Sequence, residues 1–221
     1  MLTTVSYWSS VLLYAPRRVG LPYGSYPRLL LAYLTTEAVR TKNPEIHLGA
    51  AQRLEEQLRR LLCMRLAWQT RVGLHPTSSG SGFLAAGRPC PRGLVSQLLS
   101  RRPAWRSKIV LGQDFFQEIT RSAVPVDLRA IRRLQRSPLA IDLYVWLTYR
   151  MSYLRKPTVV PWKSLEAQFG ADYSRPRDFR RRVSKLLEAV LRIYPSVRIS
   201  LTDTGLRLYP SPPHVQARSP R

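Results

Sequence analysis

The chain has 221 residues, enough for one large domain or two of ordinary size. Its 36 lysines and arginines stand against 13 acidic residues and give a formal net charge of +23, which indicates a phosphate-bearing partner such as nucleic acid. No apolar run reaches the roughly 18 residues that cross a bilayer, and the first residues lack the pattern of a signal peptide, so we expect a cytoplasmic protein that contacts no membrane.

The first 62 residues predict alternating strands and helices. A β-rich stretch at 10–15 precedes a loop, and Pro27 then begins a helix that ends near 41–42, because proline suits the first helical position. A short strand follows at 45–48. The leucines of 50–62 recur on one side and predict a second helix.

The composition then changes. Between residues 57 and 113 there are ten lysines and arginines and no acidic residue, and 71–103 mixes Ser, Gly, Pro, Arg and Cys with little periodicity. An insert of about 30 residues without structure is unusual in a compact domain. Two interpretations stay open for 63–103: a basic loop that contacts DNA, and a poorly ordered segment, which we favour.

Regular patterns return in the segment 104–136, which we expect to join the two halves of the chain. The sequence predicts a strand at 107–111, a turn into a short helix or strand at 112–119, and a helix at 129–135. The C-terminal domain is then expected at 137–213, followed by a tail at 214–221.

The C-terminal domain has the clearest pattern. Ser137 and Pro138 are typical of an N-cap and a first helical residue. Alternating apolar and polar side chains around Asp203 and Gly205 predict a hairpin. The predicted elements are a helix to about 154, a strand at 158–160, a helix at 161–169, a helix at 174–195 and two strands at 197–201 and 206–209. Their order is that of a winged helix, within an α+β fold that is mainly α.

The predicted helix at 174–195 separates apolar from basic side chains. At about 100° per residue, its apolar residues fall on one side and its basic residues on the other side and the flanks. Such a helix can pack on a core and present charge to a DNA groove; a merely solvated face is the alternative. The candidate base or phosphate contacts are Arg177, Arg181 and Lys185, with Arg175, Arg180 and Arg182 as backbone contacts.

Three more basic residues are DNA-binding candidates. Lys163 lies at the start of the preceding helix, where backbone N–H groups favour a phosphate. Arg198 and Arg207 lie on the polar side of the predicted hairpin and would follow the adjacent backbone. The neighbouring aromatic residues lie on apolar faces and are expected in the core rather than as stacking platforms. They are Tyr144, Trp146, Trp162 and Phe169.

The sequence does not favour an enzyme. The three histidines stand singly, and Cys63 and Cys90 have no metal-ligand spacing, so we expect no metal and no other cofactor. The sequence has no Gly-Lys-Ser/Thr loop for a nucleotide phosphate and no carboxylate cluster for Mg²⁺. No catalytic residue is therefore predicted.

Several stretches carry a family resemblance. The longest is SPLAIDLYVWLTYRMSYL at 137–154. The others are LPYGSYPRLLLAYLTTEAVRT at 21–41, VPVDLRA at 124–130, PW at 161–162, QFG at 168–170, RPRDFR at 175–180 and YPSPPHV at 209–215. In these stretches the chain resembles the RepA-type replication initiators of bacterial plasmids. With its flanks, the resemblance covers about 10–60 and 104–215.

The resemblance implies an initiator without enzymatic activity. Such proteins bind repeated double-stranded DNA sites at the plasmid origin, help to open it, and recruit the host initiator and replicative helicase. They are built from two winged-helix domains, the first often a dimerisation surface, so residues 1–62 are expected to form a partial winged-helix-like domain and a homodimer is one expected state. A winged-helix transcriptional regulator, including one of its own gene, and a basic structural or RNA-associated protein stay open as alternatives.

Two features depart from the family pattern. The helix and Gly-rich turn expected after 47–49 are missing, and 63–103 resembles no part of the family. Our hypothesis is that this chain carries an internal deletion and a compensated frameshift. It predicts an intact C-terminal domain and a defective N-terminal one.

Overall fold

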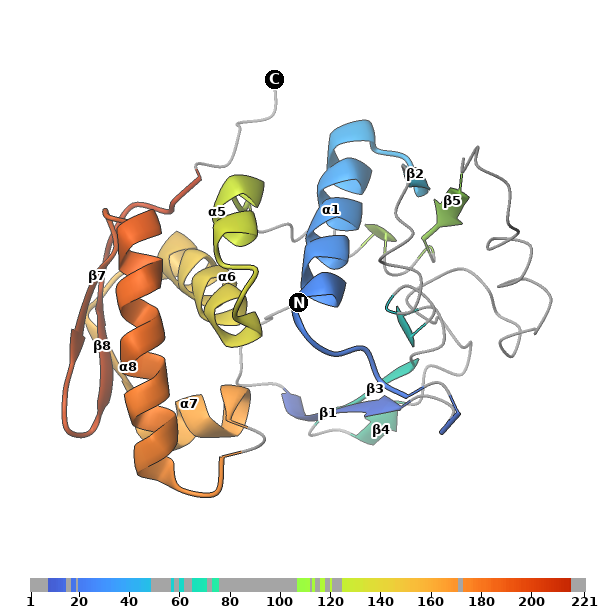
Figure 1. Cartoon of the computed structure of the whole chain (residues 1–221). Helices are drawn as coiled ribbons and strands as arrows, with labels where there is room; N and C mark the ends of the chain where they lie inside the picture. Colours follow the sequence, from blue (N-terminus) through green and yellow to red (C-terminus); the bar gives the residue numbers. More distant parts are fainter. Residues whose placement is uncertain are drawn as a thin grey trace. The chain divides into compact units, whose positions relative to one another are not determined.

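The computed structural model has two compact units, Met1–Ala123 (unit 1) and Val124–Arg221 (unit 2), shown in Figure 1. The residues that it describes are 8–14, 17–18, 20–48, 57, 60–61, 65–70, 73–75, 107–111, 113, 116–117, 120, 125–170 and 173–215. They form a mixed α and β fold in which helix outweighs strand, as predicted. The boundary between the units falls within 104–136; the finer division of the chain into five parts stays a prediction.

Unit 1 contains one long helix, α1 (Ser25–Thr41). Its buried side chains recur every three or four residues: Pro27, Leu30, Leu34 and Ala38. The predicted start at Pro27 is wrong by two residues, because Gly24 turns the chain with a φ of 78° and the helix begins directly after it. The first N–H groups of a helix have no partner within it, so proline is tolerated in this turn.

A second helix of unit 1 is described only in part. Gln57, Arg60 and Leu61 are helical, as predicted for 50–62, and the rest of that helix lies outside the described residues. The buried Gln57 accepts a hydrogen bond through Oε1 from the backbone N–H of Tyr23, at 3.1 Å. The guanidinium of Arg60 lies 4.8 Å from the centre of the Tyr23 ring. Both contacts fix the loop before α1 to this helix.

The strands of unit 1 form two small antiparallel sheets. One has the order β1-β3-β4 and the other pairs β2 with β5. Their bounds are β1 Trp8–Tyr14, β2 Glu45–Leu48, β3 Arg65–Thr70, β4 Gly73–His75 and β5 Ser107–Val110. The strands predicted at 10–15, 45–48 and 107–111 are confirmed, apart from one or two residues at their ends.

Strands β3 and β4 differ from the prediction of poor order over 63–103. β3 pairs with β1, so that Val11 lies opposite Trp68 and Leu13 opposite Leu66. Strand formation depends strongly on such pairing, and the partner lies far earlier in the chain, so the local composition did not reveal it. The rest of 63–103 lies outside the described residues, as does the predicted element at 112–119 except for three helical residues, Gln113, Phe116 and Gln117.

Unit 2 has the order of elements predicted for its part of the chain. The elements are α5 Leu128–Arg133, α6 Pro138–Tyr153, β6 Thr158–Pro161, α7 Trp162–Phe169, α8 Pro176–Ile193, β7 Arg198–Leu201 and β8 Gly205–Tyr209. The three strands form one antiparallel sheet with the order β6-β8-β7. Helices α6 and α7 pack against α8, and the hairpin of β7 and β8 lies beside α8 (Figure 1).

Helix α6 forms the centre of this unit. The Ser137 hydroxyl accepts a hydrogen bond from the N–H of Ala140, and Pro138 is the first helical residue, as predicted. Tyr144 and Trp146 are buried, which confirms their predicted place in the core. Phe169 and Trp162 are only half-buried; Phe169 contacts the edge of Trp146, with ring centres 5.8 Å apart.

The chain beyond β8 returns to the core of unit 2. Nδ1 of His214 lies 2.7 Å from the hydroxyl of Tyr144, and the His214 ring packs against Tyr194, with centres 4.9 Å apart. The Tyr194 hydroxyl donates a hydrogen bond to the carbonyl of Pro212. Residues up to His214 therefore belong to the folded unit, although the tail was predicted to begin there. The rest of the tail from 216 lies outside the described residues.

No helix within the described part of the chain is long and apolar enough to span a membrane.

Candidate nucleic-acid interface

Helix α8 has one buried and one exposed face, as predicted. The buried side chains are Phe179, Val183, Leu186, Leu187 and Val190. The predicted basic residues on the other face are exposed: Arg175, Arg177, Arg181, Arg182 and Lys185, of which Arg175 is the N-cap residue. The apolar face binds the helix to α6 and α7, so the basic face is directed to solvent.

The exposed basic residues differ in how far they are already engaged. Nη2 of Arg181 lies 3.6 Å from Oδ1 of Asp178, which is a long distance for an ion pair. Within the described residues, Arg177, Arg182 and Lys185 form no ion pair or side-chain hydrogen bond. Arg177 and Lys185 are eight residues apart, about 12 Å along the helix axis, which is comparable to the width of the DNA major groove.

The sequence analysis did not identify two further charged residues on the same face of α8. Glu188 and Arg192 are exposed and continue the stripe of Arg181 and Lys185 at helical spacing. Arg192 lies in the last turn, where a cation also interacts favourably with the helix dipole. Glu188 places a negative charge next to Lys185, so the basic residues are concentrated in the N-terminal half of α8. Spacings of three and then four residues beyond Lys185 could have revealed both.

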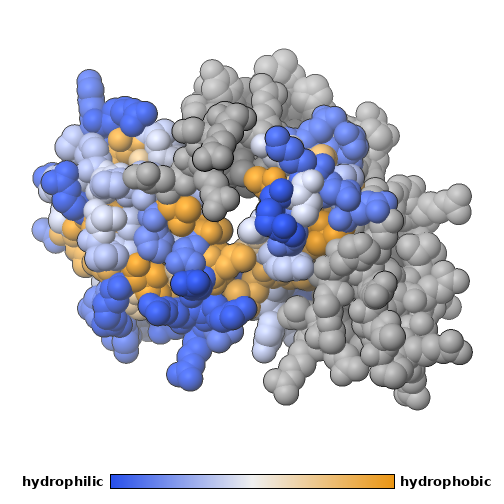
Figure 2. Space-filling model, turned by 90° about the horizontal axis from the view of Figure 1, so that it is seen from above, coloured by the Kyte–Doolittle hydropathy of each residue, from blue (hydrophilic) through white to orange (hydrophobic). Residues whose placement is uncertain are grey.

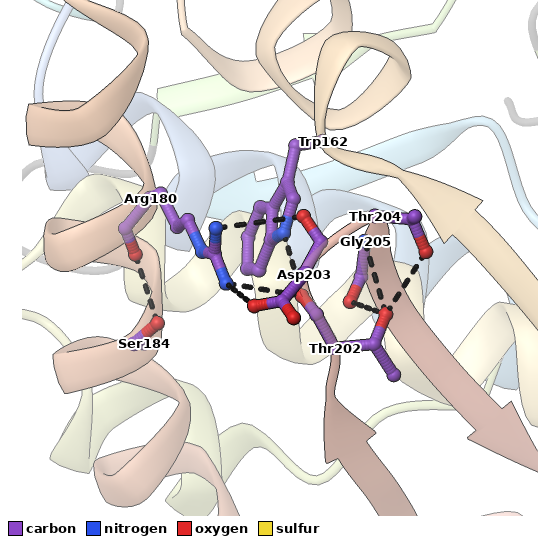
Figure 3. A network of polar contacts seen from close by, with 7 residues as sticks. All are labelled: Trp162, Arg180, Ser184, Thr202, Asp203, Thr204 and Gly205. Carbon is purple, nitrogen blue, oxygen red and sulfur yellow. Dashed lines mark hydrogen bonds and ion pairs between the residues drawn. The ribbon is translucent and has the colours of Figure 1, made fainter.

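Arg180 is not directed to solvent like its neighbours. Its guanidinium reaches the turn between β7 and β8, as Figure 3 shows. Nη2 donates to the Thr202 carbonyl at 3.2 Å and lies 3.3 Å from Oδ1 of Asp203. Nη1 is 3.4 Å from the Asp203 carbonyl, and the guanidinium carbon is 5.1 Å from the centre of the Trp162 ring. The side chain predicted to contact the DNA backbone therefore has intramolecular partners.

The two hairpin candidates are exposed but partly engaged. Nη2 of Arg198 donates a hydrogen bond to the carbonyl of Pro210 at 3.0 Å. Arg207 is on β8 beside Tyr209; hydrogen bonds from Ser200 and then from Arg207 lower the pKa of the Tyr209 hydroxyl. Lys163 is exposed as the second residue of α7. Both hairpin arginines lie on the polar side of the sheet, as predicted.

A second cationic face lies on α5 and the turn after it, and the sequence analysis did not single it out. Its residues Arg129, Arg132, Arg133 and Arg136 are all exposed. The residues between them that pack inward, Ala130, Ile131 and Leu134, are buried on the other side of the helix. Basic residues at spacings of three and four could have predicted this face. Among the described residues, none of the four arginines has an ion pair.

The visible surface of unit 2 mixes hydrophilic and apolar residues. Figure 2 shows hydrophilic residues along the outer rim of this unit, with apolar residues between them. Within the described part of the chain, no three His, Cys, Asp or Glu side chains cluster as metal ligands do. The exposed basic side chains of unit 2 supply positive charge and hydrogen-bond donors, which suit a polyanion.

Comparison with protein families adds the decisive observation. The model of the family described as plasmid-encoded RepA protein matches residues 44–163, more than half of the chain. The chain belongs to this RepA family. It is thus a protein of plasmid replication, and the resemblance expected from the sequence is confirmed. Searches of curated proteins and of solved structures return no match.

The RepA match covers only part of the interface. It includes 63–103 and extends through α5, α6 and β6 to Lys163. Helix α8 and the hairpin lie outside the matched residues, so the roles of their basic residues rest on geometry and charge alone. The deletion and frameshift suggested for the segment around 63–103 stay a hypothesis.

Proposed function

We propose that this RepA-family protein is a replication initiator that binds repeated double-stranded DNA sites at a plasmid origin, helps to open the origin, and recruits the host initiator and helicase. The observation that carries the proposal is the two-faced helix α8. Its buried side is fixed to the core of unit 2, and the N-terminal half of its exposed side is cationic. Family membership supports the plasmid origin as the site of action.

In this proposal unit 2 is a winged helix. The order helix, strand, helix, helix and hairpin, with β6 joined to the hairpin in one sheet, supports that assignment. In DNA-binding proteins with a helix-turn-helix, the second helix lies in the major groove and its N-terminal residues reach the base edges. Helix α7 ends at Phe169 and α8 begins at Pro176, and α8 has its free cations in its first half, so α8 is suited to this role.

Each basic residue then has a distinct task. Arg177, Arg181 and Lys185 contact base edges or phosphates in the groove, and Arg175 and Arg182 contact the flanking backbone. Lys163 adds a phosphate contact at the first turn of α7, and Arg198 and Arg207 add contacts from the hairpin. No covalent bond is made or broken in this mechanism, so the protein acts as a binding module and not as an enzyme.

The proposal is tested by measuring the affinity of the full chain for a duplex that carries the repeats of its own plasmid origin, across a range of salt concentrations. We expect log affinity to fall against log salt with a slope of about −5 to −6. Replacing Arg177, Arg181 and Lys185 by Gln reduces the slope by about 3 and removes the preference for origin repeats over unrelated duplex. A parental slope near −1, or a triple variant that binds as tightly as the parent, contradicts the proposal.

The matched control removes charge elsewhere. Arg17→Gln combined with Arg18→Gln neutralises two exposed arginines of unit 1 and is expected to leave the origin preference intact. Footprints on tandem repeats, with an adjacent AT-rich tract that becomes sensitive to single-strand nuclease, support an initiator. A footprint on an inverted repeat without opening instead supports a transcriptional regulator, and displacement of the duplex by RNA supports an RNA-associated protein.

A further inference from the structure

We infer that Arg180 is a positioning residue, which fixes the β7–β8 hairpin to α8, and not one of the phosphate contacts. The inference rests on the proposed function in one respect: positioning matters for DNA binding only if α8 and the hairpin contact the same duplex. The intramolecular part stands independently of DNA. It concerns the first of three consecutive arginines, of which the other two are exposed.

The guanidinium of Arg180 is committed to the hairpin turn. Its two terminal nitrogens face the carbonyl oxygens of Thr202 and Asp203 at 3.2 and 3.4 Å, and Nη2 also faces the Asp203 carboxylate at 3.3 Å. The turn is 22 residues away in the chain. A phosphate could bind these nitrogens only by displacing the turn. The Arg180 side chain is 42% exposed, whereas that of Arg181 is 85% exposed.

Trp162 joins the same turn from a third element. Its Nε1–H donates to the Thr202 carbonyl at 3.0 Å, and its backbone N–H donates to the Thr204 carbonyl at 3.1 Å. The Thr202 oxygen therefore accepts hydrogen bonds from both Trp162 and Arg180. The Arg180 guanidinium also lies over the indole ring, an arrangement favourable for a cation–π contact. Helices α7 and α8 are thus connected to one point of the hairpin (Figure 3).

The turn itself is closed by its own hydrogen bonds. The Thr202 hydroxyl donates to the Gly205 carbonyl at 2.8 Å and accepts from the Gly205 N–H at 3.1 Å. A Cβ at Gly205 would lie 2.1 Å from the Val160 carbonyl oxygen, so the backbone of the turn also packs tightly on β6. The contacts of Arg180 therefore act on a well-defined turn and set the place of the whole hairpin relative to α8.

Arg180 positions the hairpin mainly through its contacts with two backbone carbonyls and the Trp162 ring, and less through its ion pair with Asp203. The Asp203 side chain is fully exposed, and ion pairs between exposed groups contribute little. A planar guanidinium with several N–H donors can reach the carbonyls of Thr202 and Asp203 and also lie over the Trp162 ring. A lysine ammonium group cannot reproduce this arrangement. Arg180→Lys therefore retains the charge and loses the positioning.

Hydrogen exchange of the DNA-free protein tests the positioning directly. We expect Arg180→Gln and Arg180→Lys to accelerate exchange of the Trp162 and Gly205 amides by about fivefold, as loss of one or two hydrogen bonds implies. The matched control is Arg182→Gln, which removes the same charge from an exposed arginine two residues away and should leave both amides unchanged. Unchanged exchange in both Arg180 variants overturns the inference, whether or not the protein binds DNA.

A double-mutant cycle with Arg207 on the hairpin tests the consequence for binding. The affinity losses of Arg182→Gln and Arg207→Gln should multiply, because the two residues act separately. Those of Arg180→Gln and Arg207→Gln should not, because a displaced hairpin has already lost the contact of Arg207. Three results together would make Arg180 a phosphate contact instead. The affinity losses of Arg180→Gln and Arg207→Gln would multiply, and Arg180→Lys would bind DNA like the parent. Arg180→Gln would also lower the salt slope by only about 1. A parent that fails to bind duplex DNA contradicts the proposed function and leaves the exchange result decisive for Arg180.

Discussion

The hydroxyl of Tyr144 lies 2.7 Å from Nδ1 of His214, although 70 residues separate the two in the chain. The same hydroxyl accepts a hydrogen bond from the backbone N–H of Asp127, the N-cap residue of α5, at 3.1 Å. It can therefore donate its proton to Nδ1 of His214. One tyrosine in α6 thus joins the beginning of unit 2 to the segment beyond its last strand.

Replacing His214 by Ala should destabilise the protein. The change leaves the buried Tyr144 hydroxyl without its acceptor and removes the ring that packs on Tyr194. We expect the free energy of unfolding to fall by about 1–3 kcal/mol, the usual cost of an unsatisfied buried polar group. Urea unfolding followed by circular dichroism measures it. Lys156→Ala at an exposed position is the control, and an equal effect of the two changes contradicts the role of His214.

Stability should also decrease at alkaline pH because of Tyr194. Burial, followed by the nearby Tyr144, raises the pKa of Tyr194 to about 12 from its usual 10. The unfolded chain loses this proton first, so the stabilisation is complete below pH 10 and is lost as the pH rises through 12. We expect a loss of up to about 3 kcal/mol, because the pKa shift spans about two units at about 1.4 kcal/mol per unit. In urea titrations at several pH values, Tyr194→Phe should show a smaller decrease, whereas Tyr23→Phe at an exposed site should behave like the parent.

Glu188→Gln should strengthen DNA binding. The carboxylate is exposed on the cationic face of α8, where it would repel a phosphate backbone. Removing one surface charge at a few ångströms changes the interaction by about 1 kcal/mol or less, so the affinity should rise by up to about fivefold. The gain should shrink at high salt, where such charges are screened. Fluorescence anisotropy at low and high salt measures both effects, and an unchanged affinity at low salt places Glu188 away from the DNA.

Gly205→Ala should disrupt the hairpin. The added Cβ would lie 2.1 Å from the Val160 carbonyl, where two backbone segments meet and neither can yield without breaking the pairing of β6 with β8. We expect a loss of at least about 2 kcal/mol in the free energy of unfolding, typical of severe overpacking. Gly24→Ala is the comparison, because the space there is open and only the φ of 78° opposes a side chain. It should cost about 1 kcal/mol.

The arginines of α5 should contribute to DNA affinity without selecting a sequence. Arg132→Gln with Arg133→Gln removes two exposed charges from unit 2, which weakens its long-range attraction for any duplex. We expect the affinities for origin repeats and for unrelated duplex to fall by the same factor. Parallel titrations of the two duplexes measure the ratio. A change in that ratio would show that α5 reads the DNA sequence.

The local pattern of the sequence was sufficient for most of unit 2. Apolar residues at helical spacing predicted the buried face of α8, and Ser137 followed by proline predicted where α6 begins. Alternation around Asp203 and Gly205 predicted the hairpin. These properties depend on residues close together in the chain. The helix face, the helix start and the hairpin can therefore be predicted from the sequence without knowledge of the tertiary fold.

The long-range contacts were not accessible in the same way. Arg180 and Arg181 are adjacent residues of the same type, and the approach of a turn 22 residues later distinguishes Arg180. The pairing of β1 with β3 joins distant segments, so the composition of 63–103 did not reveal its two strands. The start of α1 depends on a positive φ at Gly24, which a glycine permits but does not require.

The place of His214 has a consequence for synthesis of the protein. A nascent chain that has emerged only as far as β8 would leave Tyr144 and Tyr194 without the segment that contacts them. Chains that stop in the hairpin should therefore be more sensitive to proteases than chains that include residues 210–215. The fold of unit 2 would then be completed only after the segment beyond β8 has been synthesised.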